Sequence, residues 1–129
     1  MKKSTAAWRV IGGQKKYFRS IWEANYARYL EWTRERGEIL EWQHEPKTFW
    51  FEDIKRGVRS YKPDFYVYPA DGSSQFWIEV KGFYDSKSLT KIKRMKKYYP
   101  NEKLILIDAS WFAKNNKKMS IIIRGWEHG

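Results

Sequence analysis

The amino-acid sequence predicts an α/β protein in which helices flank a central mixed β-sheet. Three observations lead to this fold class. Apolar residues recur at helical spacing in residues 20–37 and 85–99, short apolar segments typical of strands lie between and after them, and turn-forming residues separate these segments. A helix, a run of hairpin strands, a second helix and a buried strand, in this order, form one layered α/β domain.

The composition restricts the function. The chain has 129 residues and no cysteine, which predicts a single domain over residues 1–129 and excludes disulfides, thiolate zinc sites and cysteine nucleophiles. Lys and Arg number 26 against 15 Asp and Glu, so the net charge is +11, and 19% of the residues are aromatic. Cationic side chains release condensed counterions when they meet phosphates, so nucleic acid is the expected partner.

Residues 20–37 are predicted to form the first helix. Ser20 and Glu23 have the spacing of a capping box, in which the two side chains satisfy the first free backbone N–H groups. Gly37 is expected to end the helix. The basic, glycine-interrupted residues 1–16 before it are interpreted as a flexible basic arm.

Short strands are expected between the two helices and after the second one. The Asp71-Gly72 pair is typical of a tight turn and predicts a hairpin. The continuous apolar run at 104–107 is expected to be covered on both faces. The expected strands are residues 39–42, 48–51, 61–68, 76–80, 104–107 and 121–123.

Two carboxylates and a lysine are predicted to converge on this hairpin. Residues two apart in a strand point to the same face, so Glu79 and Lys81 project together while Ile78 and Val80 face the core. The hairpin turn would bring Asp64 near Glu79. Carboxylates of this type and number suit Mg²⁺, which neutralises phosphate oxygens and activates water, and the Val80 carbonyl is a candidate third oxygen ligand.

A simpler interpretation accounts for the same residues. A surface hairpin often carries a cross-strand Glu–Lys pair, and Glu-x-Lys alone has little specificity. The setting favours chemistry, because apolar residues crowd the segment and Gly82 follows Lys81 at a point where backbone can approach a phosphate. On the residues alone, both interpretations stay open.

The segments 62–65 (Lys-Pro-Asp-Phe) and 78–82 (Ile-Glu-Val-Lys-Gly) together resemble the motif of PD-(D/E)XK nucleases. The order of a glutamate-bearing helix, hairpin strands, the motif, a basic helix and a buried strand also matches that family. More narrowly, residues 17–108 are similar to phage-encoded Holliday-junction resolvases of the endonuclease I kind.

This resemblance implies a restriction-endonuclease-like core and a nuclease that depends on Mg²⁺, with Mn²⁺ expected to substitute. It implies that Asp64 and Glu79 are metal ligands and that Lys81 is the catalytic lysine. In that family a glutamate of the first helix often completes the site, and Glu23 is the matching candidate for a catalytic residue and further ligand. Its place in the capping box leaves a purely capping role open. His44 is expected to be structural, with a supporting role at the site left open.

The second helix is predicted to contact the DNA backbone. Its expected apolar stripe consists of Leu89, Ile92, Met95 and Tyr99. An ordinary solvated face is the alternative for its cationic residues. The residues predicted to bind DNA are Lys62, next to the motif, and Lys87, Lys91, Lys93, Arg94 and Lys97.

The favoured function is a structure-selective DNA endonuclease that resolves four-way junctions, because no element that reads base sequence is identifiable. Two cuts per junction imply a two-fold homodimer. The alternatives are the same chemistry on single-stranded, repair-type or restriction-type substrates, and a noncatalytic nucleic-acid-binding protein. No apolar stretch is long enough to cross a membrane, so the expected location is the cytoplasm of a bacterial or phage-infected cell.

Overall fold

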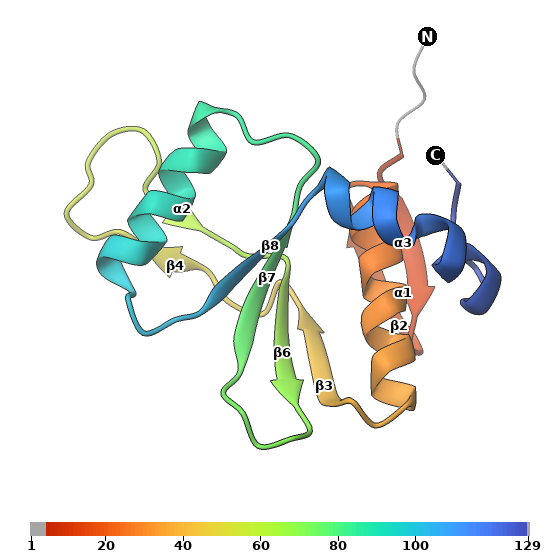
Figure 1. Ribbon diagram of the computed structural model, residues 1–129. Coiled ribbons are helices and arrows are strands. Elements are labelled where there is room, and N and C mark those ends of the chain that lie inside the picture. The colour runs from red at the N-terminus through yellow and green to blue at the C-terminus, as the bar shows by residue number, and fades with distance from the viewer. Residues whose placement is uncertain (1–4, 129) are drawn as a thin grey trace, which may run out of the picture.

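The computed structural model describes residues 5–128, and these form a mixed α/β fold around a four-stranded sheet (Figure 1). The strand order is β3-β6-β7-β8. The first three strands pair antiparallel, whereas β7 and β8 pair parallel. A parallel pair needs a long crossover, and α2 supplies it. The bounds of these strands are Ile39–His44 (β3), Phe65–Pro69 (β6), Phe76–Val80 (β7) and Leu104–Ile107 (β8).

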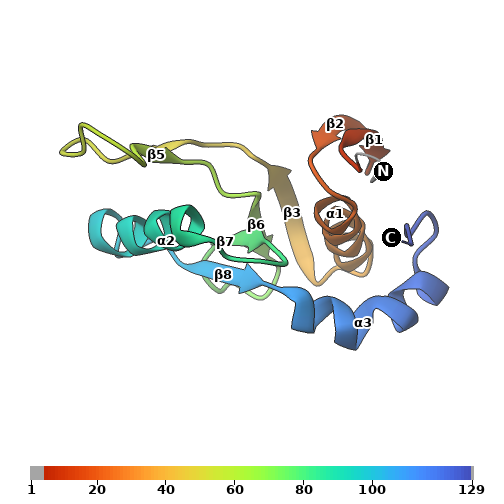
Figure 2. The same ribbon diagram turned by 90° about the horizontal axis from the view of Figure 1, so that it is seen from above.

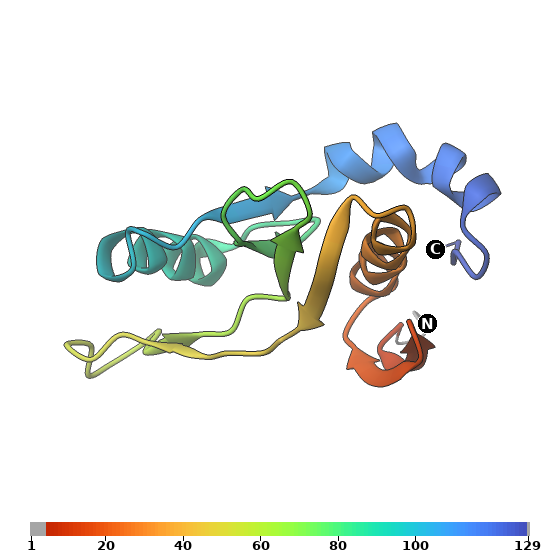
Figure 3. The same cartoon turned by 90° about the horizontal axis from the view of Figure 1, so that it is seen from below.

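The helices found within residues 5–128 are α1 (Ile21–Glu35), α2 (Ser86–Tyr98) and α3 (Ala109–Ile122). Figures 2 and 3 show α1 and α3 together on one side of the sheet and α2 on the other. An extended arm lies beside α2 and carries the short pair β4 (Phe49–Trp50) and β5 (Ser60–Tyr61). The predicted mixed sheet flanked by helices is therefore confirmed.

Two apolar clusters lie on opposite faces of the sheet, and β7 contributes to both. Ile78 and Val80 belong to the larger cluster, which α1 and α3 cover. Trp77, between them, belongs to the smaller cluster under α2 and the extended arm, together with Met95. This is the alternation expected of a strand buried on both faces. It places Glu79 on the same face as Trp77, opposite Ile78 and Val80, which confirms that Ile78 and Val80 face the core.

The ends of α1 follow the sequence signals closely. The Oγ of Ser20 accepts a hydrogen bond of 3.1 Å from the backbone N–H of Glu23. The Glu23 carboxylate does not return a bond to the cap residue; its Oε2 accepts from the N–H of Arg19 at 3.2 Å. Gly37 ends the helix with a φ of +78°, a conformation that glycine adopts without steric cost.

The segment 121–123 was predicted to be a strand, and this prediction is wrong. Ile121 and Ile122 form the last turn of α3, and Ile123 caps it. The side chain of Asp108 accepts from the Ser110 N–H and starts the helix. Phe112 and Met119, seven residues apart, are buried on one face of the helix, so helical spacing decided the structure and not the short β-branched run.

Part of the predicted basic arm is an ordered hairpin. Strands β1 (Ala7–Ile11) and β2 (Gln14–Phe18) pair antiparallel across the Gly12-Gly13 turn. Ile11 and Phe18 are buried in the larger cluster, which fixes the hairpin against α1. The flexible-arm interpretation is therefore wrong for residues 7–16. Residues 1–4 lie outside the described part of the chain.

Three further expectations are corrected. The predicted strand 61–68 is broken into β5 and β6, because Pro63 cannot donate to a ladder and the chain passes from one sheet to another. The strand β8 lies at the edge of the sheet. It is not covered on both faces, because Leu106 is 42% exposed. In α2, Leu89 is 51% exposed and Ser88 is buried in its place. No helix among residues 5–128 is long and apolar enough to span a membrane.

Candidate functional site

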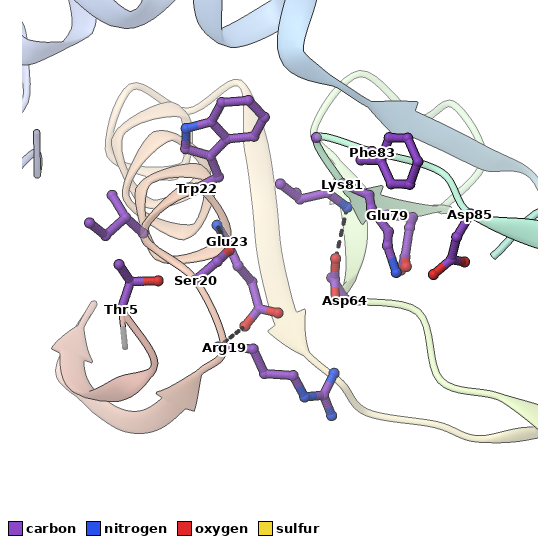
Figure 4. A pocket seen from close by; sticks show the side chains of 13 residues that line it. Thr5, Arg19, Ser20, Trp22, Glu23, Asp64, Glu79, Lys81, Phe83 and Asp85 are labelled. Carbon is purple, nitrogen blue, oxygen red and sulfur yellow. Dashed lines mark hydrogen bonds between the residues drawn. The ribbon is translucent and has the colours of Figure 1, made fainter. Parts of the chain in front are cut away.

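A cavity of about 570 Å³ lies between the start of α1, the residue that precedes β6 and the end of β7. All five residues predicted to act as catalytic groups or metal ligands line this one cavity (Figure 4). They are Glu23, Asp64, Glu79, Val80 and Lys81. Residues 56 positions apart in the sequence (from 23 to 79) are thus brought together by the packing of α1 against the sheet.

Asp64 lies at the back of the cavity and is only 5% exposed. Because Phe65 pairs with Ile78, Asp64 stands at the next position of the ladder, opposite Glu79. Its Oδ2 accepts a hydrogen bond of 2.7 Å from the backbone N–H of Val80 (Figure 4). Burial raises the pKa of Asp64 well above its usual range, the charges of Glu79 and Glu23 raise it further, and the Val80 hydrogen bond opposes them.

Glu79 points to the same side as Lys81, as predicted (Figure 4). Burial raises the pKa of Glu79, while the Tyr61 hydroxyl and the ammonium groups of Lys81 and Lys91 act in the opposite direction. The backbone N–H of Lys81 donates to the Ile107 carbonyl at 2.9 Å and anchors the end of β7 to β8. The lysine is therefore held on fixed backbone beside the two carboxylates.

Glu23 reaches the cavity from α1 and is buried in a polar network. Its Oε2 accepts from Arg19 N and lies 3.2 Å from Nε2 of His44. The His44 ring packs between Phe18 and Phe65, at centroid distances of 4.5 and 5.4 Å. His44 is thus both structural and a direct partner of Glu23, which the sequence left open. The Glu23 carboxylate thus accepts from the residue before the cap and not from the cap itself, and Glu23 also faces the site.

The residues around the cavity fit a divalent cation that takes two carboxylates. Among residues 5–128, Oε1 of Glu79 is buried and has no hydrogen-bond partner. Burial raises the pKa values of both Asp64 and Glu79, and a bound cation would favour their charged forms. The same described residues contain no group of three or more histidines or carboxylates close enough to hold a metal ion. The fit therefore rests on the Asp64–Glu79 pair and the Val80 carbonyl, and the ligand role of Glu23 stays a prediction.

Two tyrosines complete the site, and the sequence did not single them out. Burial and the neighbouring Glu79 raise the pKa values of both, that of Tyr84 to about 12. Both hydroxyls are buried near Glu79: that of Tyr61 lowers the pKa of Glu79, and that of Tyr84 has no hydrogen-bond partner within the described chain. Tyr61 stands three residues before Asp64 and Tyr84 three after Lys81. Proximity to the motif was the one available signal, and it does not distinguish these residues from the other aromatics nearby.

Gly82 is required for packing, which differs from the role inferred for it. A Cβ atom at this position would lie 2.6 Å from Cζ3 of Trp22. The Trp22 indole is itself stacked on Phe112 of α3, with ring centroids 4.5 Å apart. Close contact with an aromatic ring therefore requires a glycine here, and the approach of a phosphate to Gly82, which lines the cavity, stays a prediction.

Gly82→Ala is expected to lower the free energy of unfolding by about 1–3 kcal/mol, because the added methyl group must displace a ring that is packed on α3. Urea denaturation followed by circular dichroism measures this change. Gly72→Ala is the contrasting variant, because its φ of +85° strains an alanine although no atom would meet the new Cβ, whereas Gly82 has no positive φ and meets only the ring. Equal stability of Gly82→Ala and the parent chain would contradict the packing role.

The residues predicted to bind DNA differ in their surroundings. Lys91 faces the site, because its charge acts on Glu79 and its Nζ lies 6.0 Å from the centroid of the Tyr61 ring. Arg94 donates to the Val58 carbonyl and so holds the extended arm against α2. The remaining predicted residues, which are Lys62, Lys87, Lys93 and Lys97, are exposed.

Comparison with known proteins places the chain in one family. Residues 1–120 match DUF1064, which is described as a protein family of unknown function, and this match covers the cavity and every residue around it. A search of curated proteins gave no match. Since the family match extends over nearly the whole sequence, the chain belongs to the DUF1064 family.

Proposed function

We propose that this protein is a metal-dependent DNA endonuclease of the PD-(D/E)XK type, with Mg²⁺ as its cofactor. One observation carries the proposal. Asp64 is buried and Glu79 is partly buried beside it at the end of a hairpin, next to a lysine, in a cavity of a strongly basic protein. A purely structural Glu–Lys surface pair does not require a buried aspartate next to the glutamate, with the pKa values of both carboxylates raised.

The carboxylates of Asp64 and Glu79, with the Val80 carbonyl, would hold the ion. When bound, Mg²⁺ supplies charge neutralisation at the phosphate and a water of lowered pKa. The Val80 N–H fixes the orientation of the Asp64 carboxylate through the 2.7 Å hydrogen bond. The Lys81 ammonium, held beside Glu79, would donate to a phosphate oxygen and stabilise the charge that develops there.

The mixed sheet and the helices on both of its faces are compatible with a restriction-endonuclease-like core, and this finer assignment belongs to the proposal. Within it, the four-way junction is the leading substrate because of the resemblance to phage resolvases. A two-fold dimer would place two such cavities on one junction. A noncatalytic binding protein is a weaker candidate, because negative groups facing a phosphate would reduce its affinity.

A cleavage assay tests the function directly. Radiolabelled four-way junction, flap, single-stranded and continuous duplex DNA are each incubated with the protein in Mg²⁺, in Mn²⁺, in Ca²⁺ and in EDTA. We expect cutting in Mg²⁺ and Mn²⁺, binding without cutting in Ca²⁺, and no cutting in EDTA.

The panel also separates the alternatives. Preference for the four-way junction supports a resolvase, whereas preference for single-stranded or continuous duplex DNA supports the same chemistry on another substrate. Binding to all four substrates with no cutting in any metal would leave only the noncatalytic function. Unchanged turnover in EDTA would rule out the metal-dependent reaction.

A further inference from the structure

The loop between β7 and α2 holds a phenylalanine in solvent at the edge of the cavity. Phe83 is 76% exposed and is one of the residues that line the cavity. Figure 4 shows its ring on the same side of the site as Lys81 and Glu79. Other apolar side chains of this chain are as exposed, and single exposed apolar residues are ordinary, so what distinguishes Phe83 is its position at the cavity that contains the candidate catalytic residues.

The backbone on both sides of Phe83 is fixed. Gly82 packs directly under the Trp22 ring. On the other side, the Tyr84 hydroxyl is buried near Glu79, and Asp85 caps α2 by accepting from the Ser88 N–H at 2.8 Å. The ring is therefore presented on anchored backbone between three attachments, which reduces the conformational entropy lost when a ligand binds it.

Lysines lie near this ring beside the carboxylates of the cavity. Lys81 lines the same cavity, Lys87 is exposed in the first turn of α2, and Lys91 faces Glu79 and Asp85. A flat apolar ring flanked by lysines is the arrangement that binds a nucleobase by its face and the adjacent phosphates by their charge. An apolar protein partner would gain nothing from these lysines.

We propose that Phe83 stacks on an unpaired or end-exposed nucleobase next to the phosphate to be cut, and so directs the site to interrupted DNA such as branches, flaps and single strands. The inference rests on the proposed nuclease function and adds its substrate class. In continuous duplex each base is covered by a neighbour on both faces. Freeing one face requires unstacking, which costs as much as a single aromatic ring returns.

Fluorescence of 2-aminopurine tests the inference without cleavage. The base is placed next to the branch point of a flap or junction, and also inside a continuous duplex, and binding is measured in Ca²⁺ with wild type, Phe83→Ala, Phe83→Leu and Phe83→Trp. We expect wild type and Phe83→Trp to quench the fluorescence at the branch. Phe83→Ala and Phe83→Leu should lose the quenching and bind the branched DNA about tenfold more weakly, with duplex affinity unchanged.

Trp50→Ala removes a similarly exposed ring from β4 and should behave as wild type, because Trp50 does not line the cavity. One result would separate the two proposals. If wild type cuts interrupted DNA, and Phe83→Ala quenches the 2-aminopurine fluorescence and selects substrates as wild type does, the stacking inference fails and the nuclease function stands. An equal loss of affinity for branched and duplex DNA would also overturn it. If wild type neither binds nor cuts any DNA, both the inference and the proposed function are wrong.

Discussion

Asp64→Asn is expected to lower the rate of DNA cleavage in Mg²⁺ by about 10³-fold or more. Asparagine keeps the shape of the side chain and can still accept from the Val80 N–H, so the hairpin is retained. It removes the negative charge that a cation needs at the back of the cavity. Glu79→Gln should give a loss of the same order. Single-turnover cleavage of the preferred substrate measures both effects.

The matched control is Asp71→Asn, which changes an exposed aspartate in the turn between β6 and β7. It should cut at the wild-type rate. Affinity for DNA in Ca²⁺ should fall little in Asp64→Asn, because the lysines proposed to contact the DNA phosphates are unchanged. Cleavage at the wild-type rate by Asp64→Asn would remove Asp64 from the site.

In the absence of metal, the free energy of unfolding is expected to fall as the pH rises above 3.8, the ordinary pKa of an aspartate, and through the raised pKa of Asp64. A carboxyl group whose pKa is higher in the folded protein binds its proton more tightly there, so its contribution to stability is present at low pH and is lost as the pH rises. Glu79 acts in the same direction. Asp64→Asn should abolish most of this decline and raise the stability at pH 7 above that of wild type, because asparagine carries no charge to bury.

Urea denaturation at pH 5, 6, 7 and 8 in EDTA checks this expectation. The carboxylates with lowered pKa values, such as Asp71 and Glu127, lose their protons below this pH range. They therefore do not contribute to the change of unfolding free energy with pH that the experiment measures. Adding Mg²⁺ should restore stability at pH 7 in wild type but not in Asp64→Asn. A wild-type stability that stays level from pH 5 to 8 in EDTA would contradict the raised pKa.

Local signals predicted the parts of the fold that depend on neighbouring residues. The Ser20 cap and the Gly37 end of α1 are set by backbone groups within one turn. The Asp71-Gly72 turn sets the β6–β7 hairpin, and Asp64 meets Val80 as a consequence of that register. These features of the site could therefore be inferred from the sequence.

Other features depend on contacts that no local pattern records. His44 meets Glu23 because β3 packs beside α1, and the pair stands 21 residues apart in the sequence. The Ile121–Ile123 run has a strong β propensity, but burial of Phe112 and Met119 on one helical face outweighs it. The contact between Trp22 and Gly82 likewise becomes visible only when α1 lies against the end of β7.

The hairpin that carries the two carboxylates has a consequence for how the site forms and diversifies. Closing the short turn between β6 and β7 costs less chain entropy than bringing in α1 or the crossover helix α2. The pair Asp64 and Glu79 is thus specified by a local contact of low contact order, whereas Glu23, Lys91 and Phe83 depend on elements that join from elsewhere along the chain. In a site of this construction, the pair proposed to bind a cation can stay unchanged while the surrounding elements, and with them the choice of substrate, diverge.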